Sequence, residues 1–131
     1  MIANNSDGDL VRFYVEKSSR TFNDAKLLAA NQGWDSCANR LYYSCFYIVL
    51  ALIFNKMARR IKTHTGVRNL FNEHFVKTGI VNKQTAGFYS RLMERRAESD
   101  YDDFGFLTEE DVLPLISQTE EFIQTIQKLI L

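Results

Sequence analysis

Two short segments in the first half of the chain carry charged residues that could contact a ligand. Arg40 lies in the segment NRLYYSCF, where a charge entering an otherwise apolar stretch must meet a carboxylate, carbonyl oxygens or solvent. Lys62 and His64 lie in the segment RRIKTHTG, at the expected start of a helix. Cationic groups beside the free N–H groups of a helix start suit a phosphate. The second segment is therefore a candidate phosphate site, and the first is a candidate for a partly buried ion pair.

A third segment, near the end of a predicted helix, holds Arg96, Asp100 and Tyr101. Arg96 and Asp100 are four residues apart and therefore share one helix face. Each segment also has a purely structural interpretation. Arg40 would pair with an acid on a neighbouring helix, and the loop around Lys62 would be a solvated surface. The Arg96–Asp100 pair would be an ordinary surface ion pair, worth well under about 1 kcal/mol.

Standard enzyme and metal-site signatures are absent from the sequence. There is no glycine-rich phosphate loop, HExxH, GxSxG or cluster of acids at metal-ligand spacing, and His64 and His74 are the only histidines. Cys37 and Cys45 are eight residues apart on one predicted helix, so their Cα atoms lie about 12 Å apart, too far for a disulfide. Buried thiols of this kind are usually inert. We therefore expect reduced cysteines, no metal and no cofactor.

The charge is zero overall and unevenly distributed. The 131 residues include 16 Lys or Arg and 16 Asp or Glu, which excludes a uniformly polycationic nucleic-acid binder. Residues 1–55 carry five basic and five acidic groups, 56–96 carry ten and two, and 97–131 carry one and nine. The zero is thus a cancellation between a +8 block and a −8 block. The length and the 46% hydrophobic content predict one globular domain over residues 1–131.

The most apolar stretch, Leu41 to Phe54, predicts a buried central helix rather than a membrane span. It has 14 residues, whereas a span needs about 20, and Arg40 and Lys56 bound it closely. The N-terminus has neither the basic nor the apolar segment that is typical of a secretory signal. The expected protein is soluble and cytoplasmic, with no membrane contact.

Helical periodicity recurs along the whole chain, and no segment alternates with the period of a strand. The expected helices cover residues 9–31, 35–56, 65–76, 82–100 and 108–130. The second of them is apolar nearly all round, which places it in the middle of a bundle. Four long helices and one short one, joined by short loops, predict an all-α fold, an antiparallel up-and-down helical bundle.

Capping signals set the expected helix starts. Asp7 or Asp9 would cap the first helix. The last helix has two candidate caps. With Thr108 as the cap, Pro114 falls inside the helix and removes a hydrogen bond, whereas with Asp111 as the cap it lies in the first turn and does no harm. We therefore expect Asp111 to be the cap.

The three segments occur in an order that resembles the HEPN domain family, in its small stand-alone prokaryotic members. NRLYYSCF is followed by KTHTGVRNLFNEHFVKTG and then by LMERRAESDYDDF, and the resemblance covers roughly residues 10–128. It implies a four-to-five-helix bundle that commonly forms a homodimer. Many members are metal-independent RNases, often toxins, and others are partners of a small nucleotidyltransferase.

The resemblance also implies roles for particular residues. Catalytic members carry an arginine and, four to six residues later, a histidine near the end of a late helix, and two such motifs face each other across the dimer. The arginine stabilises phosphate charge, and the histidine assists attack by the ribose 2′-hydroxyl. Arg96 matches the arginine, but Tyr101 stands five residues later and no histidine follows. The RNase motif is therefore degenerate, while His64 and Lys62 are expected to line the same cleft.

The leading hypothesis is a HEPN-type protein that binds RNA or a nucleotide, as the partner of a nucleotidyltransferase or a component of a toxin–antitoxin pair. Arg40 and Arg96 would contact phosphate, and Lys62 and His64 would add positive charge. The net charge of the basic block, residues 56–96, supports this assignment.

Two alternatives stay open for the same residues. The first is an active, metal-independent endoribonuclease with Arg96 in its catalytic site and Asp100, Tyr101 or His64 as its base. The second is a non-enzymatic interaction module. Its excess of apolar and aromatic residues would form a homodimer interface, and its ion pairs would only stabilise the fold. Under the leading hypothesis, Asp100 and Tyr101 would instead orient the ligand or be modified.

Overall fold

The computed structural model describes the backbone of residues 2–61, 63–101 and 106–130, and within them the side chains of residues 2–7 and 97–101 lie outside the description. Its elements, in chain order, are α1 (Ile2–Ala30), α2 (Trp34–Met57), α3 (His64–Phe71), the π-helix η1 (Asn72–Val76), α4 (Lys83–Tyr101) and α5 (Glu109–Gln127). The described residues are mostly helical and form no strand, so the all-α prediction is confirmed.

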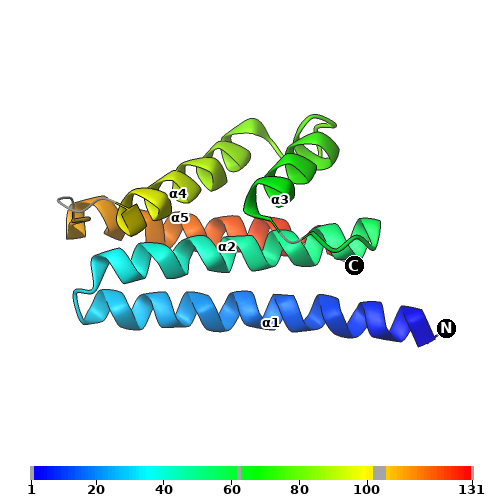
Figure 1. The fold of residues 1–131 in the computed structure, drawn as a ribbon, viewed down its shortest axis with the longest axis horizontal. Helices are drawn as coiled ribbons and strands as arrows, with labels where there is room; N and C mark the ends of the chain where they lie inside the picture. The colour runs from blue at the N-terminus through cyan, green and yellow to red at the C-terminus, as the bar shows by residue number, and fades with distance from the viewer. Residues whose placement is uncertain (1, 62, 102–105, 131) are drawn as a thin grey trace.

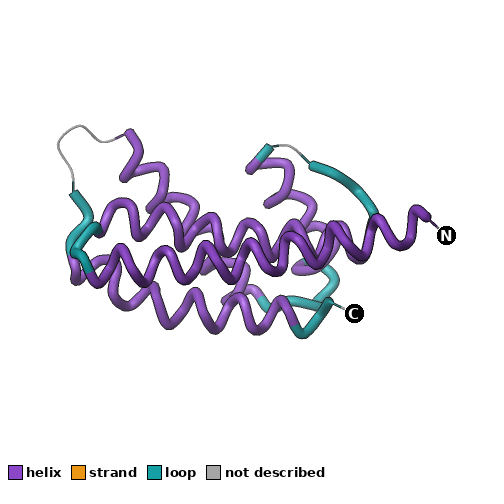
Figure 2. The backbone as a smooth tube through the Cα atoms, turned by 90° about the horizontal axis from the view of Figure 1, so that it is seen from below, coloured by secondary structure: helices purple, strands orange, loops and turns teal. Residues whose placement is uncertain are grey.

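The central position of α2 follows from its sequence. It contacts α1, α3, α4 and α5, and α1 lies antiparallel beside it along its length (Figure 1). Thirteen of its residues are buried, from Cys37 to Phe54. Helices make up nearly all of the described backbone (Figure 2), and α1 and α4 run opposite to α2 and α5 (Figure 1), so the predicted up-and-down arrangement is the one observed. Burial of this apolar helix on several sides stabilises the fold.

The apolar length of α2 raises the question of a membrane span. Trp34–Met57 is long and apolar enough to cross a membrane by length and composition, but 72% of its apolar window is buried inside the protein. A helix that is covered by its own protein chain behaves as the core helix of a soluble fold. The expectation of a buried central helix rather than a span agrees with this burial.

The start of the first helix differs from the prediction. We expected a start near residue 9, with Asp7 or Asp9 as the cap, but α1 begins at Ile2 and both residues lie inside it. Asp9 instead forms an exposed ion pair with Arg12, one turn along α1, at 3.3 Å. A helix that is already nucleated extends at one hydrogen bond per residue, so polar residues need not end it.

The start of the last helix also differs, and Asp111 is not its cap. Thr108 is the cap, because its side chain accepts a hydrogen bond from the Asp111 N–H at 3.3 Å while the Asp111 carboxylate accepts one from the Thr108 N–H at 2.9 Å. The bonds that the Asp111 carboxylate accepts from the Thr108 N–H and hydroxyl hold the pKa of Asp111 below its usual value. Pro114 therefore lies inside α5. Its missing N–H leaves only the carbonyl of the exposed Glu110 without a helical donor, and water can satisfy that group.

The predicted third helix, residues 65–76, is divided into α3 and η1. Thr63 caps α3, because its hydroxyl accepts a hydrogen bond from the Gly66 N–H at 3.0 Å. The chain then widens into η1, where the Lys77 N–H bonds to the Asn72 carbonyl. The first turn of α3 meets α2, and the C-terminal end of α4 approaches the first half of α2 (Figure 1). This arrangement brings the second and third candidate segments to the first.

Gly66 is required for the tight start of α3. A Cβ at this position would lie 2.6 Å from the Thr63 hydroxyl and 2.9 Å from the Ile61 side chain. We expect Gly66→Ala to lower the free energy of unfolding by about 1–3 kcal/mol, because the cap must move to admit the methyl group. Urea denaturation measures the effect.

The matched control is Gly87→Ala on α4, where the new Cβ would meet only the flexible end of Arg91. This substitution is expected to be neutral or to stabilise by about 0.5–1 kcal/mol, since alanine favours the helix. Equal destabilisation by both substitutions would contradict the assigned role of Gly66.

Candidate functional site

Tyr42 is the residue on which the candidate site is built. Its side chain on α2 is fully buried, and its ring stacks on that of Tyr89 from α4, with centroids 5.9 Å apart and planes at 7°. Its hydroxyl lies 2.7 Å from Nδ1 of His64, at the start of α3. The guanidinium of Arg96, on α4, lies over the same ring at 5.1 Å from its centroid. One tyrosine therefore joins three helices and supports both Arg96 and His64.

The environment of His64 favours a neutral imidazole. Its ring packs against Phe46 with centroids 4.5 Å apart, and its Nε2 faces the Tyr43 hydroxyl at 3.5 Å, the outer limit of a hydrogen bond. Burial lowers the pKa of His64, and the nearby charge of Arg96 lowers it further. Burial also raises the pKa of Tyr42 to about 12, so that phenol keeps its proton and can donate it to Nδ1. When Nδ1 accepts this bond, the neutral imidazole carries its proton on Nε2 and can donate a hydrogen bond to a ligand beside the Arg96 guanidinium.

Arg40 lies on the solvent side of the same cluster. Its guanidinium lies over the Tyr43 ring at 5.0 Å from the centroid and donates to the Asn39 side-chain carbonyl at 2.8 and 3.1 Å. Among the described side chains no carboxylate lies within 4.0 Å of it, so the structural interpretation that pairs Arg40 with an acid finds no support there. The guanidinium is thus held in place by neutral groups and keeps its positive charge available for an anion.

Three of the predicted site residues fall outside the described part of the protein. Lys62 is not described at all, and Asp100 and Tyr101 lie in the last turn of α4 with side chains outside the description. The residues that are brought together are Arg40, His64 and Arg96. They come from three separate segments and meet on the paired tyrosines of α2.

The sequence interpretation missed the role of the aromatic residues. Tyr42 and Tyr43 lie in the apolar stretch that predicts the central helix, and only their adjacency distinguishes them from its other positions. On a helix, adjacent residues point about 100° apart. One tyrosine therefore faces the core while the other faces the surface, and both can reach a group that lies above α2. This adjacency is the signal that could have identified them.

The cysteines do not contribute to the site. Cys37 and Cys45 are free and buried, as predicted. Burial raises the pKa of the Cys37 thiol to about 11 and that of Cys45 further still, so neither forms a reactive thiolate near neutral pH. In the part of the chain that the structure describes, no group of three or more His, Cys, Asp or Glu side chains could hold a metal ion.

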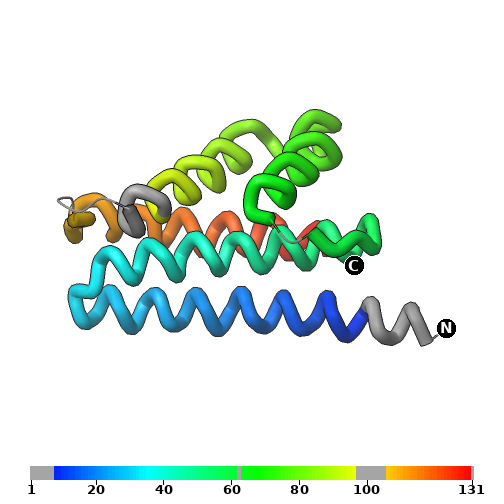
Figure 3. The backbone as a smooth tube through the Cα atoms, in the orientation of Figure 1, coloured from blue at the N-terminus to red at the C-terminus, as the bar shows by residue number. Residues whose placement is uncertain are grey.

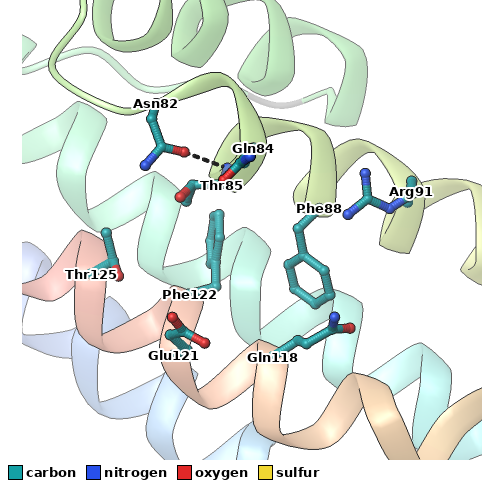
Figure 4. A pocket seen from close by; sticks show the side chains of 9 residues that line it. All are labelled: Asn82, Gln84, Thr85, Phe88, Arg91, Gln118, Glu121, Phe122 and Thr125. Carbon is teal, nitrogen blue, oxygen red and sulfur yellow. Dashed lines mark hydrogen bonds between the residues drawn. The ribbon is translucent and has the colours of Figure 1, made fainter.

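A polar pocket lies apart from this cluster, between the start of α4 and the second half of α5 (Figure 4). Its volume is about 330 Å³. None of the predicted site residues lines it. The lining residues are Asn82, Gln84, Thr85, Phe88, Arg91, Gln118, Glu121, Phe122 and Thr125.

Comparison with known proteins decides the family. The family model described as the HEPN domain matches residues 11–129 of the chain. The chain belongs to the HEPN domain family. The match spans the same region as the resemblance derived from the three segments, which is thereby confirmed.

Two relatives support this HEPN assignment. A UPF0332 protein from Thermotoga maritima is 38% identical over 126 residues, which cover 96% of this chain and 95% of the relative. A candidate toxin from Methanocaldococcus jannaschii is 26% identical over 114 residues, or 87% of this chain and 77% of the relative. Within this HEPN chain, Arg96 of α4 and His64 of α3 both contact the ring or hydroxyl of Tyr42.

The lowered pKa of His64 has a measurable consequence. We expect NMR titration of the ring protons to give a pKa below 6.5, and Arg96→Gln to raise it, because the substitution removes the repelling charge. The folded protein then binds fewer protons than the unfolded chain between the folded pKa and 6.5. The contribution of His64 to stability is therefore complete above 6.5 and is lost as the pH falls through the folded pKa. A pKa above 6.5 would contradict the described environment.

Proposed function

We propose that this HEPN protein binds RNA or a nucleotide through phosphate at the cluster of Arg40, His64 and Arg96. One observation supports this proposal. The buried side chain of Tyr42 contacts both residues, with its ring beneath Arg96 and its hydroxyl bonded to His64. A guanidinium held against a ring and beside a neutral imidazole is pre-organised for an anion, so little side-chain entropy is lost when a phosphate binds.

The residues divide the work of binding by their chemistry. The guanidinium of Arg96 can donate two parallel hydrogen bonds to phosphate oxygens, and the guanidinium of Arg40 can donate a second such pair. His64 can donate one further hydrogen bond from a ring nitrogen, and Lys62 lies two residues before it in the chain. Asp100 and Tyr101 follow Arg96 within one helical turn and would orient the ligand or be modified.

The test of this function is direct binding of RNA. A fluorescent single-stranded oligoribonucleotide is titrated with the purified protein in the absence of divalent metal, and anisotropy is recorded. We expect saturable binding that weakens with salt, because phosphate contacts release counterions. An absence of binding at low salt would contradict the proposal.

The second part of the proposal concerns the partner. The name of the Methanocaldococcus jannaschii relative supports a component of a toxin–antitoxin pair, and the family supports a nucleotidyltransferase partner and a homodimer. Co-purification from the native host followed by mass spectrometry tests both, with a search for a nucleotide adduct on Tyr101. The solution mass tests the dimer, since one chain weighs 15.2 kDa.

A second candidate function is a metal-independent endoribonuclease, and the position of His64 favours it. In the tautomer in which the Nδ1–H of His64 donates to the Tyr42 oxygen, Nε2 could take the proton of a ribose 2′-hydroxyl, whose oxygen would attack phosphorus while the 5′-oxygen departs and takes a proton from water. The products would carry 2′,3′-cyclic phosphates in the presence of EDTA. His64→Gln should abolish cleavage and His74→Gln should preserve it, whereas a wild-type protein that leaves a broad RNA panel intact would contradict this candidate.

A further inference from the structure

We propose that single-stranded RNA lies along a row of aromatic side chains that runs from His64 across α2 onto α1. We name this row the aromatic track and define it as Phe13, Tyr14, Tyr47 and Tyr43. The inference rests on the proposed RNA binding and names the form of RNA and the surface that holds it. In Figure 3 the two helices that carry the track lie side by side along their length.

The rings of the track form a continuous series. Phe13 meets Tyr14 with ring centroids 5.3 Å apart, and Tyr14 stacks on Tyr47 at 6.3 Å and 18°. Tyr47 meets Tyr43 at 5.9 Å, and Tyr43 meets His64 at 5.4 Å. Successive contacts therefore lead from α1 to the candidate site without a gap.

The track lies at the surface. The Phe13 side chain is 45% exposed, and the other three rings are half-buried. Each of these rings therefore keeps part of its apolar area in contact with water. Contiguous exposed apolar area on a soluble protein indicates a binding surface.

Two cations cover the faces of the track. The Lys17 ammonium lies 4.6 Å from the Tyr47 centroid and 5.5 Å from the Phe13 centroid, and the Arg40 guanidinium lies 5.0 Å from the Tyr43 centroid. Neither has a carboxylate within 4.0 Å among the described side chains. Partly exposed rings with two cations among them suit a polymer of flat bases and phosphates.

The charge of the surface favours nucleic acid over a second copy of the chain. A two-fold axis through the track would gather the Lys17 and Arg40 cations of both copies at one interface, which is unfavourable. The RNA must be single-stranded, because a duplex hides the faces of its bases within its own stack. The bases would stack on exposed ring and guanidinium surfaces, with one phosphate held at the Arg96 site.

The test compares oligouridylates of increasing length with uridine 3′,5′-bisphosphate, a probe of one nucleotide. We expect wild-type affinity to rise with length. Phe13→Ala combined with Lys17→Ala should weaken binding of the long oligomer by about 10-fold or more and leave the bisphosphate unchanged. The matched control is Lys26→Ala, which removes another cation–ring pair on α1, over Phe22, outside the track.

The outcomes separate the inference from the function on which it rests. Affinity that does not rise with length, or a Phe13/Lys17 variant that behaves like the Lys26 control, would overturn the track while the nucleotide site stands. A wild-type protein that binds neither probe would overturn both. A variant that changes the solution mass and not the RNA affinity would overturn the track and assign this face to a second copy.

Discussion

Replacing Tyr42 with alanine is expected to lower the free energy of unfolding by about 3–5 kcal/mol, because a fully buried aromatic side chain leaves a cavity in the core. The same change removes the ring that supports Arg96 and the hydroxyl that bonds to His64. RNA binding should therefore fall even under conditions where the variant is folded. Urea denaturation measures the first effect, and anisotropy at low temperature measures the second.

Tyr42→Phe separates the ring from the hydroxyl. The phenylalanine keeps the stacking on Tyr89 and the surface beneath Arg96, and it loses only the hydrogen bond to His64. We expect a loss of about 0.5–1.5 kcal/mol in the free energy of unfolding. Equal losses for the alanine and phenylalanine variants would contradict the claim that the ring is the main support of this region.

Arg96→Ala is expected to weaken RNA binding by about 10-fold to 100-fold, the effect of losing charge-assisted hydrogen bonds to a phosphate. The side chain is half-buried, and its guanidinium is oriented by the Tyr42 ring. The slope of log affinity against log salt should also become shallower by about 1 for each phosphate contact that is lost. Anisotropy titrations at several salt concentrations measure both quantities.

The control for this variant is its neighbour in sequence. Arg95→Ala removes the same net charge from the same helix, but the Arg95 side chain is exposed, whereas that of Arg96 is half-buried over the Tyr42 ring. If the phosphate site is at Arg96, Arg96→Ala should weaken RNA binding strongly and Arg95→Ala only slightly. Similar effects from both would indicate a diffuse electrostatic attraction and would contradict a defined phosphate site.

The fold could be predicted from the sequence wherever the pattern is long and strong. The apolar stretch of α2 predicts its burial, and the helical periodicity of the other segments predicts the all-α bundle that is observed. Helix starts were harder, because they depend on single side chains. Thr108 and Asp111 can each cap a helix, and only the reciprocal hydrogen bonds in the structure decide between them.

The candidate site could be predicted only in part. Arg40, His64 and Arg96 stand out in the sequence by charge and by their place in the three segments, and their role in binding stays a prediction. The contact between His64 and Tyr42 was not predictable, since the two residues are 22 positions apart on different helices. Local spacing carries no information about such a pair, because it depends on where α3 meets α2.

The most direct test of the account is an NMR titration of the two histidine rings with single-stranded RNA. His64 lies in the proposed site, whereas His74 lies on η1 and lines a separate pocket with Leu52 and Met57. We expect the His64 ring resonances to shift and saturate with added RNA while those of His74 stay in place. Saturable binding that moves His74 and leaves His64 unchanged would contradict a phosphate site at Arg96 and His64.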